Sequence, residues 1–235
     1  MIRLFIILCI VFLTSCQMVP ESLQSSAKET QSKEERVETV NQPFVLSAEK
    51  GDTPNVLKLL QDGADINAVD ERGRTAVMAA TYNNKVDTVK ELIQKGADLN
   101  IRDHNLNNVL LYAGAEGFLD IVKLAVDADA NTKLTNRFGG TALIPASERG
   151  HVEVVEELLT HSDIDIDHIN NLHWTALLEA VILGNGGEKH QKIVQLLVDH
   201  GADVHIADGD GITPLQHAKK RGYREIEHIL QQSGA

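Results

Sequence analysis

The chain repeats one pattern at an interval of 33 residues. Segments that begin at Thr75, Asn108 and Thr141 each start with a polar residue, continue with a largely apolar run and close on alanine. The pattern returns at Thr175 and Thr213, after intervals of 34 and 38 residues. A fixed period of this size is typical of a solenoid, in which each unit buries its apolar face by stacking on its neighbours. Such proteins usually offer extended binding surfaces and rarely catalyse reactions.

Each unit predicts two short helices enclosed by turns. The Thr or Asn that opens the repeated segment is a good N-cap for the first helix. A glycine ends the second helix, because only glycine adopts the left-handed conformation without cost. These helix-ending glycines open the segments 63–67, 96–100 and 201–205, and further loop glycines follow at Gly73, Gly139 and Gly211.

The spacing of apolar residues in the second helix of the fourth unit predicts one buried face. Val152, Val155 and Leu159 share one helical face. Val154 and Leu158 lie beside that face. Apolar residues at this spacing indicate a helix that packs one side against a core.

These units resemble ankyrin repeats over about residues 43–232. Thr213-Pro214-Leu215 matches the family's Thr-Pro-Leu-His start except at its fourth residue. The resemblance implies an all-α ankyrin-repeat solenoid of about six helix-turn-helix units with loop and β-turn fingers, the first unit being a shortened cap. The family's histidine slot holds mostly apolar residues here, which predicts apolar packing in place of a polar network: Met78, Leu111, Ile144, Leu178 and Gln216.

Three residues stand where the repeat pattern expects a left-handed glycine. Leu106 and His173 take the loop position, and Asp129 takes the helix-ending position. A residue with a Cβ in that conformation costs on the order of 1 kcal/mol. The fifth unit also contains an insertion, predicted as a loop over Gly184–His190, which accounts for its long interval.

The first fifteen residues predict a secretory signal. Arg3 gives a cationic start, and the apolar run Leu4–Leu13 is too short to span a bilayer core of ~30 Å. The run ends in Leu13-Thr14-Ser15-Cys16, which resembles the bacterial lipoprotein signal. The resemblance implies that Cys16 is acylated and becomes the new N-terminus after cleavage. An ordinary signal peptide cleaved elsewhere, with Cys16 present by chance, is the alternative.

The polar segment that follows predicts a tether. It is rich in Ser, Gln, Glu and Lys without an apolar period, so it cannot bury enough surface to offset its ordering entropy. The predicted organisation is a removed signal peptide over 1–15, a lipidated Cys16 with a tether over 16–41, and an ankyrin-repeat domain over 42–235. Gln17 follows the cysteine, and in the lipoprotein family this implies the outer membrane, facing the periplasm; the inner membrane stays an alternative.

The net charge restricts the class of partner. It is −12 for the whole chain and −13 once residues 1–15, with Arg3, are removed. Nucleic acid and anionic lipid both require a basic footprint. The charge therefore predicts a protein partner, with membrane contact through the N-terminal lipid only, and we expect a monomer.

The ankyrin resemblance implies where a partner would bind. Members of the family contact partners with their loop tips and the exposed ends of their first helices. The register assigns eight residues of this chain to such contacts: Phe138, Leu172, Trp174, Ile182, Leu183, Tyr82, Glu148 and Arg149. Apolar residues cluster among them in adjacent units, as in an interaction hot spot. The alternative is that the Gly184–His190 insertion folds back and covers them.

No motif indicates a metal site or an active site. Nine of the ten histidines follow residue 150, but none forms a His-x-x-x-His pair, so structural roles are favoured. The acidic run 163–167 lacks the glycine and distal glutamate of a calcium loop. Motifs of nucleophilic, phosphate-binding and zinc-dependent enzymes are missing from the sequence. We expect no enzymatic activity and no cofactor or metal.

These observations predict a protein-binding module of the bacterial envelope. It would bind a periplasmic partner through its concave face and loop tips, as a scaffold, protective or regulatory factor. An immunity-like inhibitor of a periplasmic toxin or enzyme is one alternative. A purely structural spacer is another.

Overall fold

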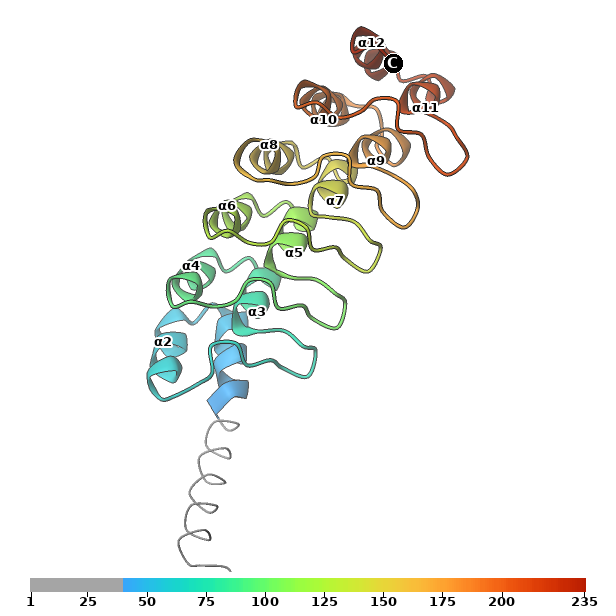
Figure 1. The fold of residues 1–235 in the computed structure, drawn as a ribbon. Helices are drawn as coiled ribbons and strands as arrows, with labels where there is room; N and C mark the ends of the chain where they lie inside the picture. Colours follow the sequence, from blue (N-terminus) through green and yellow to red (C-terminus); the bar gives the residue numbers. More distant parts are fainter. Residues whose placement is uncertain (1–39) are drawn as a thin grey trace, which may run out of the picture. The chain divides into compact units, whose positions relative to one another are not determined.

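The computed structural model describes residues 40–235, which form six pairs of helices (Figure 1). Within this part of the chain the only strand-like feature is an isolated antiparallel bridge between Val69 and Thr75. The predicted all-α solenoid of six units is therefore confirmed. The predicted signal peptide, Cys16 and most of the tether lie outside the described residues. None of the described helices is long and apolar enough to cross a membrane.

The helices form two layers, with a long loop extending from each unit to the next (Figure 1). The first unit pairs a helical segment over 40–50 with α2 (Thr53–Gln61). Residues 40 and 41, which we assigned to the tether, are therefore part of this unit. The first helices of the later units are α3 (Ala76–Tyr82), α5 (Val109–Glu116), α7 (Leu143–Glu148), α9 (Ala176–Ile182) and α11 (Pro214–Arg221). Their second helices are α4 (Val86–Gln94), α6 (Leu119–Asp127), α8 (Val152–His161), α10 (Glu188–Asp199) and α12 (Arg224–Gln232).

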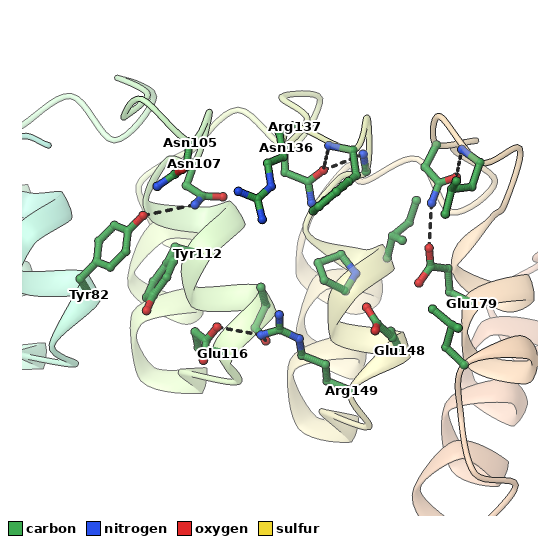
Figure 2. Close-up of a pocket in the computed structure, with 18 residues that line it drawn as sticks. Tyr82, Asn105, Asn107, Tyr112, Glu116, Asn136, Arg137, Glu148, Arg149 and Glu179 are labelled. Carbon is green, nitrogen blue, oxygen red and sulfur yellow. Dashed lines mark hydrogen bonds and ion pairs between the residues drawn. The ribbon is translucent and has the colours of Figure 1, made fainter. Parts of the chain in front are cut away.

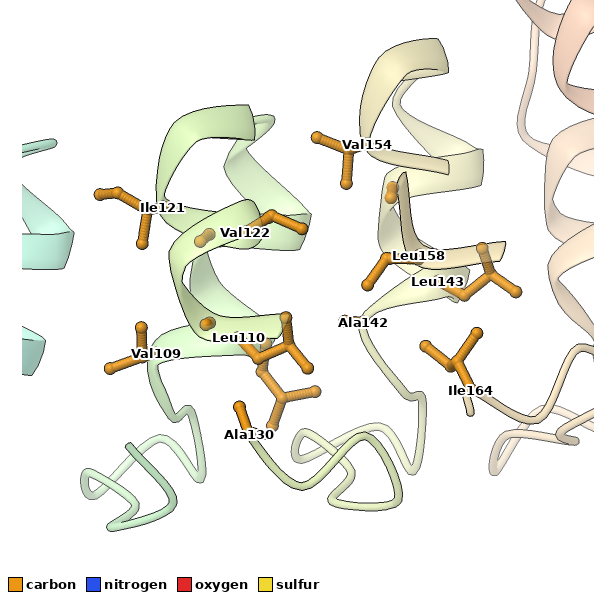
Figure 3. Close-up of a cluster of buried hydrophobic side chains, with 14 of the residues drawn as sticks. Val109, Leu110, Ile121, Val122, Ala130, Ala142, Leu143, Val154, Leu158 and Ile164 are labelled. Carbon is orange, nitrogen blue, oxygen red and sulfur yellow. The ribbon is translucent and has the colours of Figure 1, made fainter. Parts of the chain in front are cut away.

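Each unit packs only on its neighbours. First helices contact first helices, as α7 contacts α9, and second helices contact second helices, as α6 contacts α8. The buried side chains between them are almost all aliphatic and form one continuous core (Figure 3). The position that holds histidine in the family's Thr-Pro-Leu-His start belongs to this core here, because Met78, Leu111, Ile144 and Leu178 are buried. Apolar packing at that slot is confirmed for these four units.

The predicted N-caps form in four of the five repeated segments. Thr75, Thr175 and Thr213 each accept a hydrogen bond from the backbone N–H three residues later, and Asn108 does the same. Such a cap satisfies one of the free N–H groups at the start of a helix.

Thr141 does not cap its helix, contrary to the prediction. In the second unit the N–H of Ala79 donates to the carbonyl of Thr75, four residues back. The equivalent residue of the fourth unit is Pro145, which has no N–H to donate. The Thr141 carbonyl accepts instead from Ile144, and α7 starts at Leu143. As a result, the Thr141 hydroxyl is buried without a hydrogen-bond partner.

The buried stripe of α8 is rotated from the one we predicted. Val154, Val155 and Leu158 are buried, whereas Val152 and Leu159 are only half-buried. The reason is that α8 packs on three helices, α6, α7 and α10, rather than on one side alone. The buried face of α8 is therefore broader than the single stripe that we predicted, and it is centred on Val154, Val155 and Leu158.

The predicted left-handed positions are confirmed. Leu106, Asp129 and His173 have φ angles of 61°, 53° and 62°, in the region that favours glycine. The fifth-unit insertion is shorter than predicted, because Glu188 to His190 form the first turn of α10. The two helices of that unit are connected by Leu183–Gly187.

Candidate functional site

A groove of about 450 Å³ lies over the second to fifth units (Figure 2). Its walls come from two sources, the loop tips between units and the first helices α3, α5, α7 and α9. Both belong to the surface that the repeat register assigned to partner contacts. The groove has an aromatic end, a middle with two arginines, and an acidic end.

The aromatic end is built by two stacked tyrosines. The ring centroids of Tyr82 and Tyr112 are 3.8 Å apart, with 28° between the ring planes. The Tyr82 hydroxyl donates to a carboxylate oxygen of Asp103 and accepts from Asn107 Nδ2 at 3.2 Å. Burial raises the pKa of Tyr82, and the hydrogen bond to Asp103 raises it further. The phenol therefore stays neutral and presents a fixed aromatic surface.

The two arginines in the middle of the groove are already engaged. Arg149 Nη1 donates to Glu116 Oε1 and to the backbone carbonyl of Ala115, both at 2.7 Å. The Arg137 guanidinium lies over the Phe138 ring, 4.7 Å from its centroid. A cation–π contact of this kind is attractive, and the Phe138 side chain remains 56% exposed.

The acidic end contains Glu148 and Glu179, which lie close together in Figure 2. Glu179 is only 4% exposed. Its Oε1 accepts a hydrogen bond from Asn170 Nδ2 at 2.8 Å. Burial raises the pKa of Glu179 to about 7, and the charge of Glu148 adds to the increase, while Asn170 opposes it. This carboxyl group therefore changes its protonation state near neutral pH.

Asn170 is fixed by the loop that precedes α9. Its Oδ1 accepts from the backbone N–H groups of Leu172 and Trp174, at 2.9 and 3.1 Å. Because the carbonyl oxygen is used in this way, the amide nitrogen points to Glu179. The loop thus determines which group meets the buried carboxylate.

Six of the eight residues predicted for partner contacts line the groove: Tyr82, Phe138, Glu148, Arg149, Leu172 and Leu183. Phe138, Leu172 and Leu183 are large apolar side chains with exposed fractions of 56%, 55% and 49%. The insertion therefore leaves them uncovered.

Ile182 and Trp174 lie elsewhere. Ile182 is only 8% exposed, so its assignment to an exposed helix end was wrong. It is the last residue of α9 and still faces inward, while the next residue, Leu183, is the exposed one. Trp174 is half-buried and does not line the groove.

The insertion supports the acidic end from behind. His190 is buried, and its Nε2 donates to the backbone carbonyl of Glu148 at 2.9 Å. On its other side, the Tyr223 hydroxyl donates to the carbonyl of Gly184 at 3.1 Å. The insertion and the first turn of α10 together therefore connect the fourth, fifth and sixth units.

Other histidines also have structural roles. His168 Nε2 donates to the carbonyl of Gly139 at 2.7 Å, and His217 Nε2 lies 2.7 Å from Asp208 Oδ2. Among residues 40–235, no group of three or more His, Cys, Asp or Glu side chains is arranged to hold a metal ion. Ile164, in the acidic run 163–167, is buried in the core.

Glu179 is one of several groove residues that the sequence analysis missed, together with Tyr112, Pro145 and Asn170. It stands four residues after the cap Thr175, and Tyr112 and Pro145 stand four residues after the openings of their own units. All three line the groove. Comparing this slot between units would have identified Glu179.

Helix pairs, loop fingers and a groove across successive units together define an ankyrin-repeat binding scaffold. The family model of ankyrin repeats (three copies) matches residues 44–136 and 110–208. The chain therefore belongs to the ankyrin-repeat family, whose repeats are protein–protein interaction modules.

Bacterial relatives match nearly the whole repeat domain. Ankyrin repeat protein YahD of Escherichia coli (strain K12) is 39% identical over 192 residues, which cover 82% of this chain and 96% of that protein. A crystal structure of an ankyrin repeat domain from Acinetobacter baumannii AYE is 49% identical, with a TM-score of 0.80, and the match covers 82% of this chain and 98% of that domain. The ankyrin repeat domain of Bcl-3, a member of the IkappaB protein family, is 25% identical with a TM-score of 0.74, covering 82% of this chain and 86% of that domain.

Proposed function

We propose that the chain is a lipid-anchored protein of the bacterial envelope that binds a periplasmic protein through the groove over its second to fifth units. The observation that carries the proposal is the groove itself. It combines stacked tyrosines, three exposed apolar side chains on loops and helix ends, and two carboxylates on adjacent helices. Aromatic and apolar side chains at an otherwise polar surface are typical of interaction hot spots.

Phe138 and Leu172 provide the test of the groove as the binding site. They are more than half exposed, so alanine at both positions removes contact area while leaving the core intact. We expect the double variant Phe138→Ala, Leu172→Ala to lose a partner that wild-type protein captures from envelope fractions. Ile169 is 49% exposed and does not line the groove, so Ile169→Ala is a matched control that retains the partner. Equal capture by all three proteins would place binding outside the groove.

The envelope location is supported by the Leu13-Thr14-Ser15-Cys16 motif, and the outer membrane by Gln17. These residues predict that Cys16 carries a lipid and that the mature chain fractionates with the outer membrane. Cys16→Ser should abolish incorporation of labelled palmitate into the protein. Cys9→Ser is the control, because cleavage would remove that residue with the signal peptide. Unchanged palmitate labelling of Cys16→Ser would refute lipidation at this residue while leaving the binding role intact.

An inhibitory role is the second candidate. The net charge of −12 and the two carboxylates at one end of the groove favour a basic partner, which electrostatic steering would bring in quickly. If the captured partner is an enzyme or toxin, its activity in the presence of this protein distinguishes the roles. Suppression supports an inhibitor, and unchanged activity supports a scaffold.

A further inference from the structure

Glu179 points into the groove because of its place in the repeat. Tyr112 and Pro145 occupy the same slot in the two preceding units, and both line the groove. A buried carboxylate at this slot is therefore presented to whatever occupies the groove. Glu148, which is half-buried, lines the groove beside it.

In the sixth unit the same slot holds a basic side chain beside a carboxylate. There His217 stands in the slot, and its Nε2 lies 2.7 Å from the carboxylate of Asp208 in the preceding loop. In the fifth unit the carboxylate, Glu179, is on the helix, and the loop position holds Asn170. The amide donates a hydrogen bond but supplies no positive charge. The fifth unit thus lacks the basic half of the pair.

No cation inside the groove replaces it. Arg149 is paired with Glu116 at 2.7 Å, and Arg137 lies over Phe138. Within residues 40–235, the side chains of Glu148 and Glu179 form no ion pair. A buried carboxylate without a cation is costly, because it loses its hydration without gaining a charge partner.

We propose that the Glu148–Glu179 end of the groove receives a lysine or arginine side chain from an extended segment of the partner protein, with an adjacent apolar side chain of that segment on Phe138 and Leu172. This inference rests on the proposed function and specifies the chemistry of the segment that is bound. The basic head group supplies the positive charge that Asn170 cannot provide.

The apolar lining next to the carboxylates suits the rest of such a side chain. Leu172 and Leu183 are about half exposed and line the groove together with Glu179. Lysine and arginine bury their methylene stems along apolar surface while the charged end reaches a polar partner. A neutral polar side chain would satisfy hydrogen bonds here but leave the two carboxylates uncompensated.

A display library of short randomised peptides, selected on the purified full-length protein, tests the proposal. We expect enriched peptides to share a lysine or arginine at one fixed position beside an apolar residue. Glu179→Gln should weaken binding of an enriched peptide by about tenfold or more, because a desolvated ion pair is lost. Glutamine can still accept from Asn170, so the fold is retained. Glu153→Gln, an exposed residue of α8 outside the groove, is the control of equal charge and should bind as wild type does.

A double-mutant cycle then identifies the contact. Replacing the basic residue of the peptide by norleucine should weaken binding to wild type strongly and binding to Glu179→Gln only slightly. Equal losses on both proteins would overturn the proposed ion pair. Peptides without a fixed basic residue that still require Phe138 and Leu172 would overturn the inference and leave the proposed function intact. Enrichment that ignores the Phe138→Ala, Leu172→Ala change would overturn both.

Discussion

Replacing Glu179 with glutamine should change how the stability of the protein depends on pH. The pKa of Glu179 is raised from 4.5 to about 7 in the folded protein, by burial and by the neighbouring charge of Glu148. The unfolded chain has no such environment, so its glutamate titrates at the ordinary value. Between about pH 5 and 7 the folded state therefore binds more protons than the unfolded state.

The sign and size of the effect follow from this difference. Because the folded state binds the extra proton, the free energy of unfolding falls as pH rises through the window, and the stability provided by the protonated group is lost above pH 7. One pKa unit corresponds to about 1.4 kcal/mol, so a shift of this size costs about 3 kcal/mol at pH 8. Glutamine keeps the hydrogen bond from Asn170 and does not titrate. We expect Glu179→Gln to match wild type near pH 4.5 and to be more stable by about 3 kcal/mol at pH 8.

Urea unfolding of both proteins at several pH values between 5 and 8 measures this difference directly. His151 also has a shifted pKa, lowered chiefly by burial, but it is present in both proteins and cancels in the comparison. Glu153→Gln, which removes an exposed carboxylate outside the groove, is the control of equal charge change. A stability difference for Glu179→Gln that stays constant from pH 5 to 8 would refute the argument that burial holds this carboxyl protonated.

Two further predictions concern the repeat framework. Thr141→Val removes a buried hydroxyl that has no hydrogen-bond partner, so it should leave the free energy of unfolding unchanged or raise it by up to about 1 kcal/mol. Thr175→Val removes a side chain that caps its helix and should lower the free energy of unfolding by about 1 kcal/mol. Equal losses for the two variants in urea unfolding would contradict the description of Thr141. Leu106→Gly relieves a left-handed backbone and Asn105→Gly only loosens the unfolded chain, so the first variant should be the more stable of the two by about 1 kcal/mol in thermal unfolding. An Asn105→Gly variant as stable as Leu106→Gly would show that the loop stores no strain.

The sequence predicted the units well because each unit depends on local spacing and on contact with its neighbours. The cap residues, the apolar slot of Met78 and Leu178, and the left-handed positions of Leu106 and His173 all follow from the repeat period. Phe138 could be placed in the groove for the same reason, since its loop position repeats from unit to unit.

The predictions that were wrong, and the groove residue Glu179 that was not predicted, depend on tertiary contacts. The uncapped start of α7 depends on which backbone N–H reaches the Thr141 carbonyl, and the consequence of Pro145 is visible only once the helix is built. Ile182 and Leu183 are neighbours at the end of α9, yet the first side chain is buried and the second is exposed. At a helix end, a shift of one residue in the predicted register changes which side chain faces the core. Glu179 looks like a solvated residue in its own helix, and its burial is created by α7 and by the loop that carries Asn170.

The sixth unit contributes no residue to the groove lining, but it covers the helices of the fifth unit, which does line the groove. Its helices α11 and α12 cover α9 and α10, and α12 buries only Ile226 and Leu230 of its own residues. A premature stop codon before Thr213 would leave every groove residue in the translated product. The same product would expose the apolar faces of α9 and α10 to water. Such a truncation would therefore abolish function through aggregation and degradation of the protein, although all the side chains that bind the partner would still be present.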